Sequence, residues 1–197
     1  ELNPGLIYCS ITGYGEWGPD KDRPAYDLVV QAEGGMMSIT GEPDGQPVRV
    51  GVAITDIVTG LYSTQSIIAA LLEREIGDGR GQKLDMSLLD SAAALNSYAA
   101  MFYFATGDPP ERRGGKIKNI VPYQAFETAD DYAVIAVPSE HLWPKFCEAL
   151  DRPDLLADER FETNTDRVAN RDVLEADVGR DATVRGRRAD EHRPRGV

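Results

Sequence analysis

The sequence predicts an α/β fold, because strand-like and helix-like apolar segments alternate over its first hundred residues. Residues 6–11 are typical of a buried strand of the parallel type. Residues 57–72 repeat apolar side chains at helical spacing on most sides, which indicates an internal helix. Residues 83–87 alternate like a second strand, and a largely apolar helix is expected over 88–105.

Between these elements lie a loop, a broken helix and a turn. Residues 13–18 match G-x-G-x-x-G, but a dinucleotide fingerprint requires the last glycine to open a helix. A polar loop with a proline at each end follows instead, so we reject that interpretation. The next helix is expected over 26–39, weakened at Gly34-Gly35, and residues 41–45 are a strong turn signal.

A change of composition after residue 106 indicates a second domain. Two strand-like segments, 123–128 and 132–137, predict a β-hairpin, and an amphipathic helix capped by Ser139 follows over 139–150. Residues 176–197 contain no aromatic residue and no aliphatic side chain larger than Val, so this tail is expected to be disordered or aberrant. The predicted divisions are a large domain over 1–106, a linker over 107–122, the start of a small α+β domain over 123–175, and the tail.

Composition excludes several classes of function. A net charge of −12 over 197 residues argues against a nucleic-acid partner. Two histidines and two cysteines do not support a metal centre, and Cys9 and Cys147 are interpreted as ordinary buried thiols. No apolar run reaches the length of a membrane span and no signal peptide is evident, so we expect a cytoplasmic protein with no membrane partner.

Asp56 is the candidate reactive residue, because it lies where a glycine-containing loop enters the long apolar helix. The free N–H groups and dipole at a helix N-terminus favour an anionic carboxylate by about 0.3–1 kcal/mol. An anionic carboxylate in a poorly solvated pocket is a competent nucleophile. Asp is also among the commonest N-cap residues, so position alone favours a purely structural capping role.

A set of motifs in a fixed order carries more information than any single one. The motifs are Asn3–Tyr8, Gly13–Gly15 with Gly18-Pro19, Arg23–Asp27, Thr40–Pro43, Gly51–Asp56, Gly79–Gln82 and Asp85–Asp90. In this order and spacing the sequence resembles the family III CoA-transferases, a superfamily that includes formyl-CoA and carnitine CoA-transferases and acyl-CoA racemases. The resemblance extends from about residue 3 to about residue 175.

The resemblance implies a function for Asp56 as the nucleophile. In this family the aspartate attacks an acyl-CoA thioester to give a mixed anhydride, and returning CoA gives an aspartyl-CoA thioester that an acceptor carboxylate then displaces. The implied partners are an acyl-CoA and a small carboxylic acid. Coenzyme A enters as a thioester substrate, so no cofactor and no metal are expected.

The resemblance also implies binding residues. Tyr26 falls at a position that holds the CoA or acyl group, and Gly114 and Gly115 resemble a glycine loop that closes over the intermediate. Taken without the resemblance, these two glycines are ordinary linker residues. Racemases of this superfamily carry a histidine where this sequence has Tyr26, and a tyrosine, with a pKa near 10, is a poor base for α-proton removal. Tyr26 therefore favours a transferase over a racemase.

The sequence is interpreted as a fragment of such an enzyme. Family members carry a Rossmann-like N-terminal portion and a C-terminal return to the large domain, and they form interlocked homodimers of ring-shaped subunits. We expect the 197-residue chain alone to be inactive and marginally folded. A non-catalytic remnant that contacts a partner is the alternative from another functional class.

Overall fold

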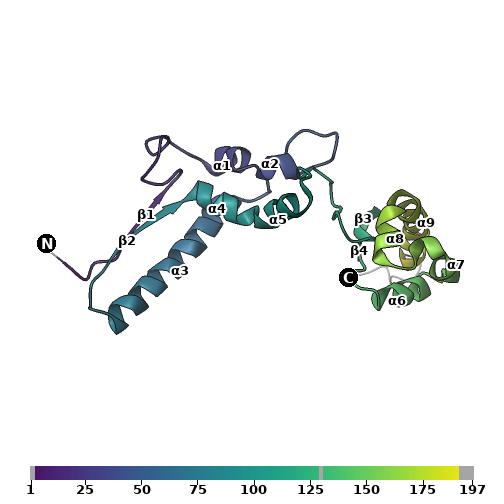
Figure 1. Cartoon of the computed structure of the whole chain (residues 1–197). Coiled ribbons are helices and arrows are strands. Elements are labelled where there is room, and N and C mark those ends of the chain that lie inside the picture. Colours follow the sequence, from purple (N-terminus) through teal and green to yellow (C-terminus); the bar gives the residue numbers. More distant parts are fainter. Residues whose placement is uncertain (1–2, 129–130, 191–197) are drawn as a thin grey trace. The chain divides into compact units, whose positions relative to one another are not determined.

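The computed structural model describes residues 3–128 and 131–190, with side chains described as far as residue 181 (Figure 1). The chain forms two compact units, Glu1–Gly114 and Gly115–Val197. The break between them falls inside the segment predicted as a linker, 107–122. Each unit is described by itself below.

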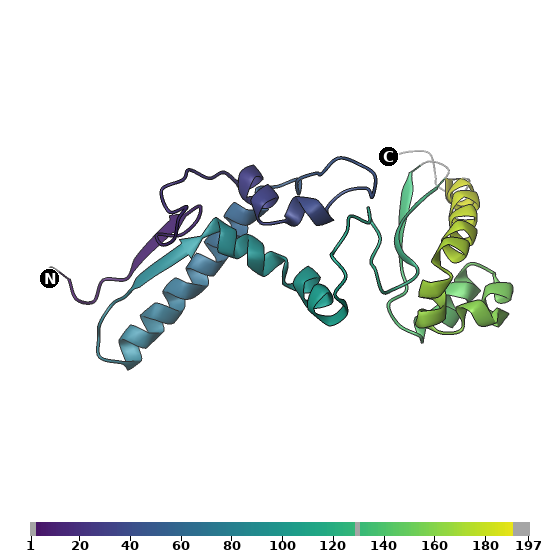
Figure 2. The ribbon, with the colours of Figure 1, turned by 45° about the horizontal axis from the view of Figure 1, so that its top comes forward.

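The first unit is built on a pair of parallel strands. Strand β1 (Tyr8–Thr12) pairs with β2 (Lys83–Ser87), with Tyr8 opposite Lys83 and Thr12 opposite Ser87. Parallel neighbours require a crossover connection, and helices provide it here. The helices of this unit are α1 (Asp27–Glu33), α2 (Met36–Ile39), α3 (Ile54–Ile76), α4 (Leu88–Leu95) and α5 (Ser97–Thr106). Figures 1 and 2 show α3 running alongside the two strands.

Most predicted elements of this unit are present, with breaks at specific residues. The expected helix over 26–39 is interrupted at Gly34-Gly35, where Gly35 has a φ of 83°. The expected helix over 88–105 is divided at Asn96. No helix begins at Gly18, and the next one starts at Asp27, so rejection of the dinucleotide fingerprint is confirmed.

Helix α3 buries its polar face, not its apolar one. Its buried residues are Thr55, Thr59, Ser63 and Ala70. The Thr59 hydroxyl donates to the Thr55 carbonyl (2.6 Å) and lies 2.8 Å from the Ser91 hydroxyl of α4. Short side chains with such partners allow two helices to approach closely without leaving polar groups unpaired. The prediction of an internal helix is therefore wrong within this chain, because its apolar side chains are exposed: Ile57, Leu61, Ile68 and Leu72.

The apolar core of the first unit is small. It consists of Val30, Met36, Leu88 and Ala92, so α1, α2 and α4 pack around one cluster. The parallel pairing predicted for the first strand is confirmed, but its burial is not, because Tyr8 is 54% exposed. The reason is that its sheet contains two strands among the described residues. A parallel strand becomes fully buried only when both faces are covered.

The second unit begins with the predicted hairpin. Strands β3 (Tyr123–Glu127) and β4 (Tyr132–Ala136) are antiparallel, and Tyr123 lies opposite Ala136. The remaining elements are α6 (Leu142–Ala149), α7 (Pro153–Ala157), the 3₁₀ helix η1 (Glu159–Phe161), α8 (Asn164–Ala169) and α9 (Arg171–Asp190). Helix α6 begins three residues after the predicted cap Ser139, whose hydroxyl instead lies 3.1 Å from His141 Nδ1.

Helix α9 contradicts the prediction of a disordered tail over residues 176–190. The helix starts at Arg171, and Leu174 and Val178 on its first turns are fully buried in the core of this unit. Burial of these two side chains offsets the entropy lost when the helix forms. The polar residues that follow them could not offset that entropy by themselves. Residues 191–197 of the predicted tail lie outside the described residues.

Arg167 lies at the centre of the second unit with no exposed surface. Its guanidinium donates to the carbonyls of Val121 (3.1 Å) and Phe161 (2.9 Å) and to the Glu140 carboxylate (2.8 Å). It also stacks 4.7 Å from the centre of the Trp143 ring. The bond from Arg167 and a backbone N–H hold the pKa of Glu140 below its usual value. One buried cation thus connects the start of β3, η1 and α6.

Candidate active site

Asp56 is the third residue of α3, and its side chain is exposed. The N-cap of α3 is Ala53, which has no side-chain oxygen to accept a hydrogen bond. The capping interpretation of Asp56 is therefore wrong, and so is the expectation that it lies in a buried environment. Its carboxylate projects from the first turn of a 23-residue helix, where the helix dipole favours the anion. Such a carboxylate is accessible to an electrophile.

The acceptor that an N-cap residue would normally provide for α3 comes from another helix, α1. Asp27, the first residue of α1, accepts from the Thr55 backbone N–H (2.9 Å) and the Thr55 hydroxyl (2.7 Å) through Oδ1. Its Oδ2 accepts from the Gln31 side-chain amide (2.7 Å). Gln31 is fully buried, and its Oε1 accepts from the Val50 backbone N–H (2.8 Å). Asp27 is not among the site residues predicted from the sequence, although an aspartate four residues before a glutamine is a pair that a helix brings together.

Tyr26 occupies the N-cap position of α1, and its side chain is 76% exposed. Tyr26 immediately precedes Asp27, and Asp56 immediately follows Thr55. The bonds from Thr55 to Asp27 therefore bring together the two segments that carry the predicted site residues. Both side chains are open to solvent in this chain.

Gly114 lies against the turn at residues 41–45. Its backbone N–H donates to the Gly41 carbonyl (2.8 Å), and its φ is 60°. A Cβ on Gly114 would lie 2.7 Å from a carboxylate oxygen of Glu42. The neighbouring Arg112 donates to carbonyls of the same turn, including that of Gly45 (3.0 Å). Gly115 belongs to the second unit, where a Cβ would meet no atom closer than 3.8 Å.

Comparison with known proteins identifies the family. The family model described as CoA-transferase family III matches residues 1–192. The chain belongs to this family. It is 46% identical to the succinate–glutarate CoA-transferase of Agrobacterium fabrum over 170 aligned residues. These residues make up 86% of this chain and 42% of the relative. It is 40% identical over 177 residues to the acetyl-CoA:oxalate CoA-transferase of Acetobacter aceti, covering 89% of this chain and 45% of the relative.

The fold agrees with that assignment. A crystal structure of a CAIB/BAIF family protein from Brucella suis matches with a TM-score of 0.78 at 41% identity, covering 98% of this chain and 52% of that one. The predicted α/β class and the resemblance to family III CoA-transferases are therefore confirmed. The chain spans less than half the length of the curated relatives named above.

The two loop glycines of this family III chain are expected to differ in tolerance of a side chain. Gly114→Ala places a Cβ on a residue with a left-handed φ, at a cost of about 1–2 kcal/mol. A Cβ on Gly115 would make only an ordinary contact, 3.8 Å from the Ala125 backbone nitrogen, so Gly115→Ala is expected to change stability by less than about 0.5 kcal/mol. Denaturant unfolding of both variants tests this ordering. Equal losses would show that the Gly114 backbone does not hold the left-handed conformation.

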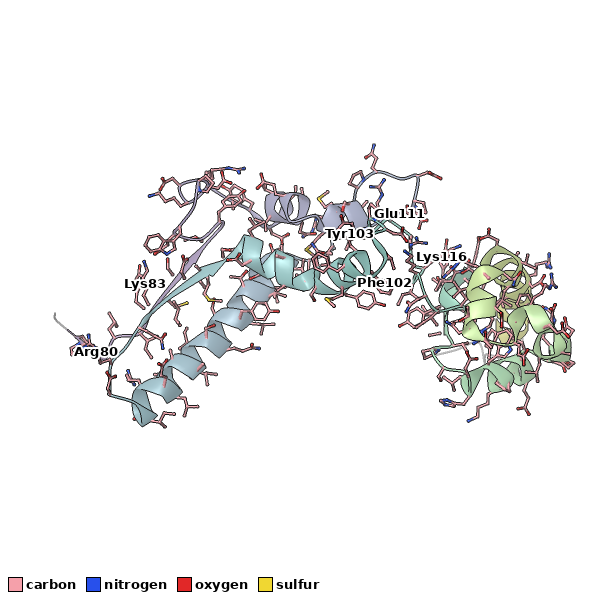
Figure 3. All side chains as sticks on the ribbon, viewed as in Figure 1. Arg80, Lys83, Phe102, Tyr103, Glu111 and Lys116 are labelled. Atoms are coloured by element: carbon pink, nitrogen blue, oxygen red, sulfur yellow. The ribbon has the colours of Figure 1, made fainter. Side chains whose placement is uncertain are left out.

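The aromatic residues near the end of α5 form neither a buried core nor an enclosed pocket in this family III chain. Tyr98, Tyr103 and Phe104 are exposed, and Tyr98 contacts Phe102 edge to face at 5.0 Å. Figure 3 shows Phe102 and Tyr103 among the side chains that project from α5. The three exposed side chains therefore do not pack in the core of the first unit.

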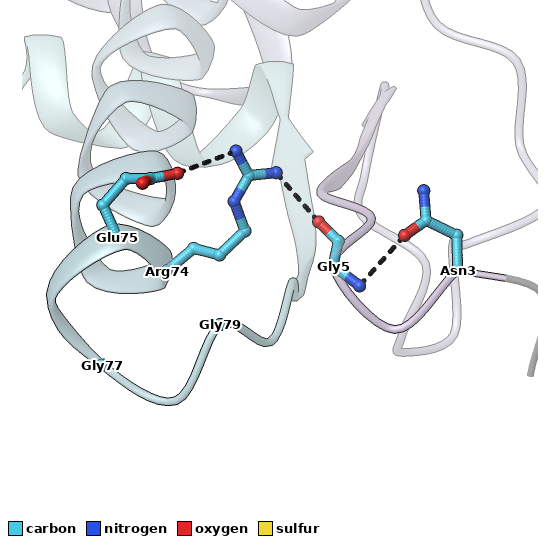
Figure 4. A pocket seen from close by; sticks show the side chains of 6 residues that line it. All are labelled: Asn3, Gly5, Arg74, Glu75, Gly77 and Gly79. Carbon is cyan, nitrogen blue, oxygen red and sulfur yellow. Dashed lines mark hydrogen bonds and ion pairs between the residues drawn. The ribbon is translucent and has the colours of Figure 1, made fainter.

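The hollow at the other end of α3 is remote from Asp56. In Figure 4, Arg74 donates to the Gly5 carbonyl (3.0 Å), and Gly77 and Gly79 form part of the wall. Arg74 lies 18 positions after Asp56 on the same helix, or about 27 Å away at 1.5 Å per residue. Among the described residues, no group of three or more His, Cys, Asp or Glu side chains is arranged to hold a metal ion. No helix in the described part is long and apolar enough to cross a membrane.

The Cys147 thiol of the second unit is not suited to act as a nucleophile. Cys147 has no exposed surface, and burial raises the pKa of its thiol to about 11. A thiol of this kind is protonated at neutral pH and behaves as a small apolar residue. The interpretation of Cys147 as an ordinary buried thiol is confirmed, whereas Cys9 is only half-buried.

Proposed function

We propose that the full-length protein carrying this chain transfers CoA from an acyl-CoA thioester to a carboxylic acid, with Asp56 as the nucleophile. The observation that carries the proposal is the exposed Asp56 carboxylate, which makes no cap bond at the N-terminus of α3. Membership of CoA-transferase family III supports the class of reaction. The transferase function is proposed for the whole protein, of which this chain carries Asp56, Tyr26 and the two loop glycines.

The proposed reaction begins when an Asp56 oxygen attacks the carbonyl carbon of the thioester. A C–O bond forms, the C–S bond breaks, and CoA leaves as the thiolate, which gives an acyl-aspartyl anhydride. The thiolate then attacks the Asp56 carbonyl and releases the donor acid as its carboxylate, which gives an aspartyl-CoA thioester. The acceptor carboxylate repeats these two steps in reverse, so the new acyl-CoA leaves and the Asp56 carboxylate is regenerated. Covalent catalysis of this kind divides one difficult exchange into easier steps.

The anhydride must be protected from water, because it hydrolyses. Asp56 is exposed in this chain, so we propose that the bound acyl-CoA and the remaining length of the protein shield it. Tyr26 is proposed to hold the CoA or acyl group. Gly114 and Gly115 are proposed to let the loop approach the intermediate and direct N–H groups at the developing oxyanion. No cofactor takes part in these steps, and the full-length protein is proposed to act as an interlocked homodimer.

Dicarboxylic acids are the proposed substrates. The relatives are named for succinate, glutarate and oxalate, all of which carry a second carboxylate beside the one that accepts CoA. We therefore propose a short dicarboxylic acid as acceptor and the CoA monothioester of a different short acid of this class as donor.

The test is to trap the acyl enzyme in the full-length protein. The protein is incubated with succinyl-CoA, glutaryl-CoA, oxalyl-CoA or acetyl-CoA and quenched with hydroxylamine, and the peptide containing Asp56 is analysed by mass spectrometry. A hydroxamate on Asp56 is expected with at least one dicarboxylic donor. An unmodified peptide with every donor, in protein that still binds CoA, would refute the covalent route. Exchange of the α-proton without acyl exchange would instead assign a racemase.

A further inference from the structure

We infer that Asp27 is a positioning residue for the Asp56 nucleophile, an inference that rests on the proposed function. The first N–H groups of any α-helix lack partners within the helix. In α3 the N-cap residue Ala53 cannot accept a bond from them. Asp27 performs this task from α1, because its carboxylate accepts the backbone N–H of Thr55, the second residue of α3.

The Asp27 carboxylate is fully engaged on both oxygens. Oδ1 accepts two bonds from Thr55, at 2.9 Å from the N–H and 2.7 Å from the hydroxyl, and Oδ2 accepts one from Gln31 at 2.7 Å. Gln31 in turn accepts the Val50 N–H at 2.8 Å, which fixes the segment leading into α3. Hydrogen bonds to a half-buried carboxylate are stronger than those between neutral groups. Asp27 therefore holds α1, the 50–53 segment and α3 in one arrangement.

The same contacts distinguish the two carboxylates. Asp27 directs both oxygens at protein donors, whereas the Asp56 carboxylate is exposed and makes no cap bond. Asp27 accordingly acts through Thr55 and does not itself attack the thioester. Because Asp56 directly follows Thr55, the Asp27 carboxylate fixes the backbone beside the proposed nucleophile.

Positioning of this kind affects the rate of reaction more than the binding of substrate. The attacking oxygen must reach a carbonyl carbon at about 3–3.5 Å with correct alignment, and an error of about 1 Å costs on the order of 10²-fold in rate. CoA contacts distant from the reacting carbon are unaffected by such an error. Loss of the Asp27 contacts is thus expected to lower kcat and to leave KM for the acyl-CoA nearly unchanged.

The test compares three variants of the full-length protein. Asp27→Asn keeps the size of the side chain but turns one acceptor into a donor that faces Gln31 or Thr55. Thr55→Val keeps the shape and removes one bond of the two. Thr64→Val is the control on the same helix, because the exposed Thr64 hydroxyl donates to the Gly60 carbonyl within α3 and not to another helix. Steady-state kinetics are measured together with the single-turnover rate of hydroxamate formation on Asp56.

We expect Asp27→Asn to lower kcat and the hydroxamate rate by about 10- to 100-fold with KM within about 3-fold of the parent. Thr55→Val should show a smaller loss in the same two quantities, and Thr64→Val should match the parent. A parent-like kcat for Asp27→Asn, or a change in KM alone, would overturn the inference while the proposed function stands. If Asp27→Asn does not fold, Thr55→Val decides in the same way.

Failure of the proposed function gives a different result. In that case the parent protein itself forms no hydroxamate with any donor, and the positioning role falls with it.

Discussion

Replacement of Asp56 by alanine in the full-length protein is expected to lower the rate of CoA transfer by at least about 10³-fold, as loss of a covalent nucleophile does elsewhere. Asp27 cannot take over the attack, because its two oxygens accept three hydrogen bonds. Formation of the new acyl-CoA, followed by chromatography with each donor and acceptor pair, measures the loss. The hydroxamate on the peptide containing residue 56 should disappear at the same time.

Stability should change little in the same variant. The Asp56 side chain is exposed and provides no cap bond, so only its interaction with the helix dipole is lost, worth about 0.3–1 kcal/mol. Asp22→Ala, in the exposed loop before α1, is the matched control and should retain the parent rate. Transfer by Asp56→Ala at a rate near that of the parent would show that another group forms the covalent bond.

The family and the order of elements could be predicted from sequence because they depend on local patterns. The period of apolar residues defined β2 to the residue, and the pair Gly34-Gly35 marked the break between α1 and α2. The position of Asp56 near the start of α3 followed from where the apolar run begins. These features need no knowledge of which segments meet in space.

The errors concern contacts that are distant in sequence. The period of apolar residues shows which face of α3 is apolar, and that face was expected to be buried. The buried face instead carries Thr59 and Ser63, and Thr59 contacts α4. The cap of α3 comes from Asp27, 28 residues before Thr55, so no local pattern could reveal it. Likewise, the composition of residues 176–190 predicts disorder, whereas Leu174 and Val178 fix the start of the helix that contains them.

Replacement of Arg167 by methionine is expected to destabilise the chain by about 2–6 kcal/mol, as measured by denaturant unfolding. Methionine fills much of the volume but has no donor, so the carbonyls of Val121 and Phe161 lose their partner. Each buried acceptor left without a hydrogen bond costs about 1–3 kcal/mol. The stacking of the guanidinium on Trp143 is lost as well.

Arg160→Met is the matched control for this loss. Arg160 pairs with Asp158 and lies 5.2 Å from the centre of the Phe161 ring, but its side chain is more than half exposed. An exposed ion pair contributes about 0–1 kcal/mol, so the same substitution should cost little there. Because both arginines flank the same aromatic cluster, a comparable loss in the two variants would attribute the effect to arginine stacking. A loss confined to Arg167→Met assigns it to the buried carbonyls that Arg167 satisfies.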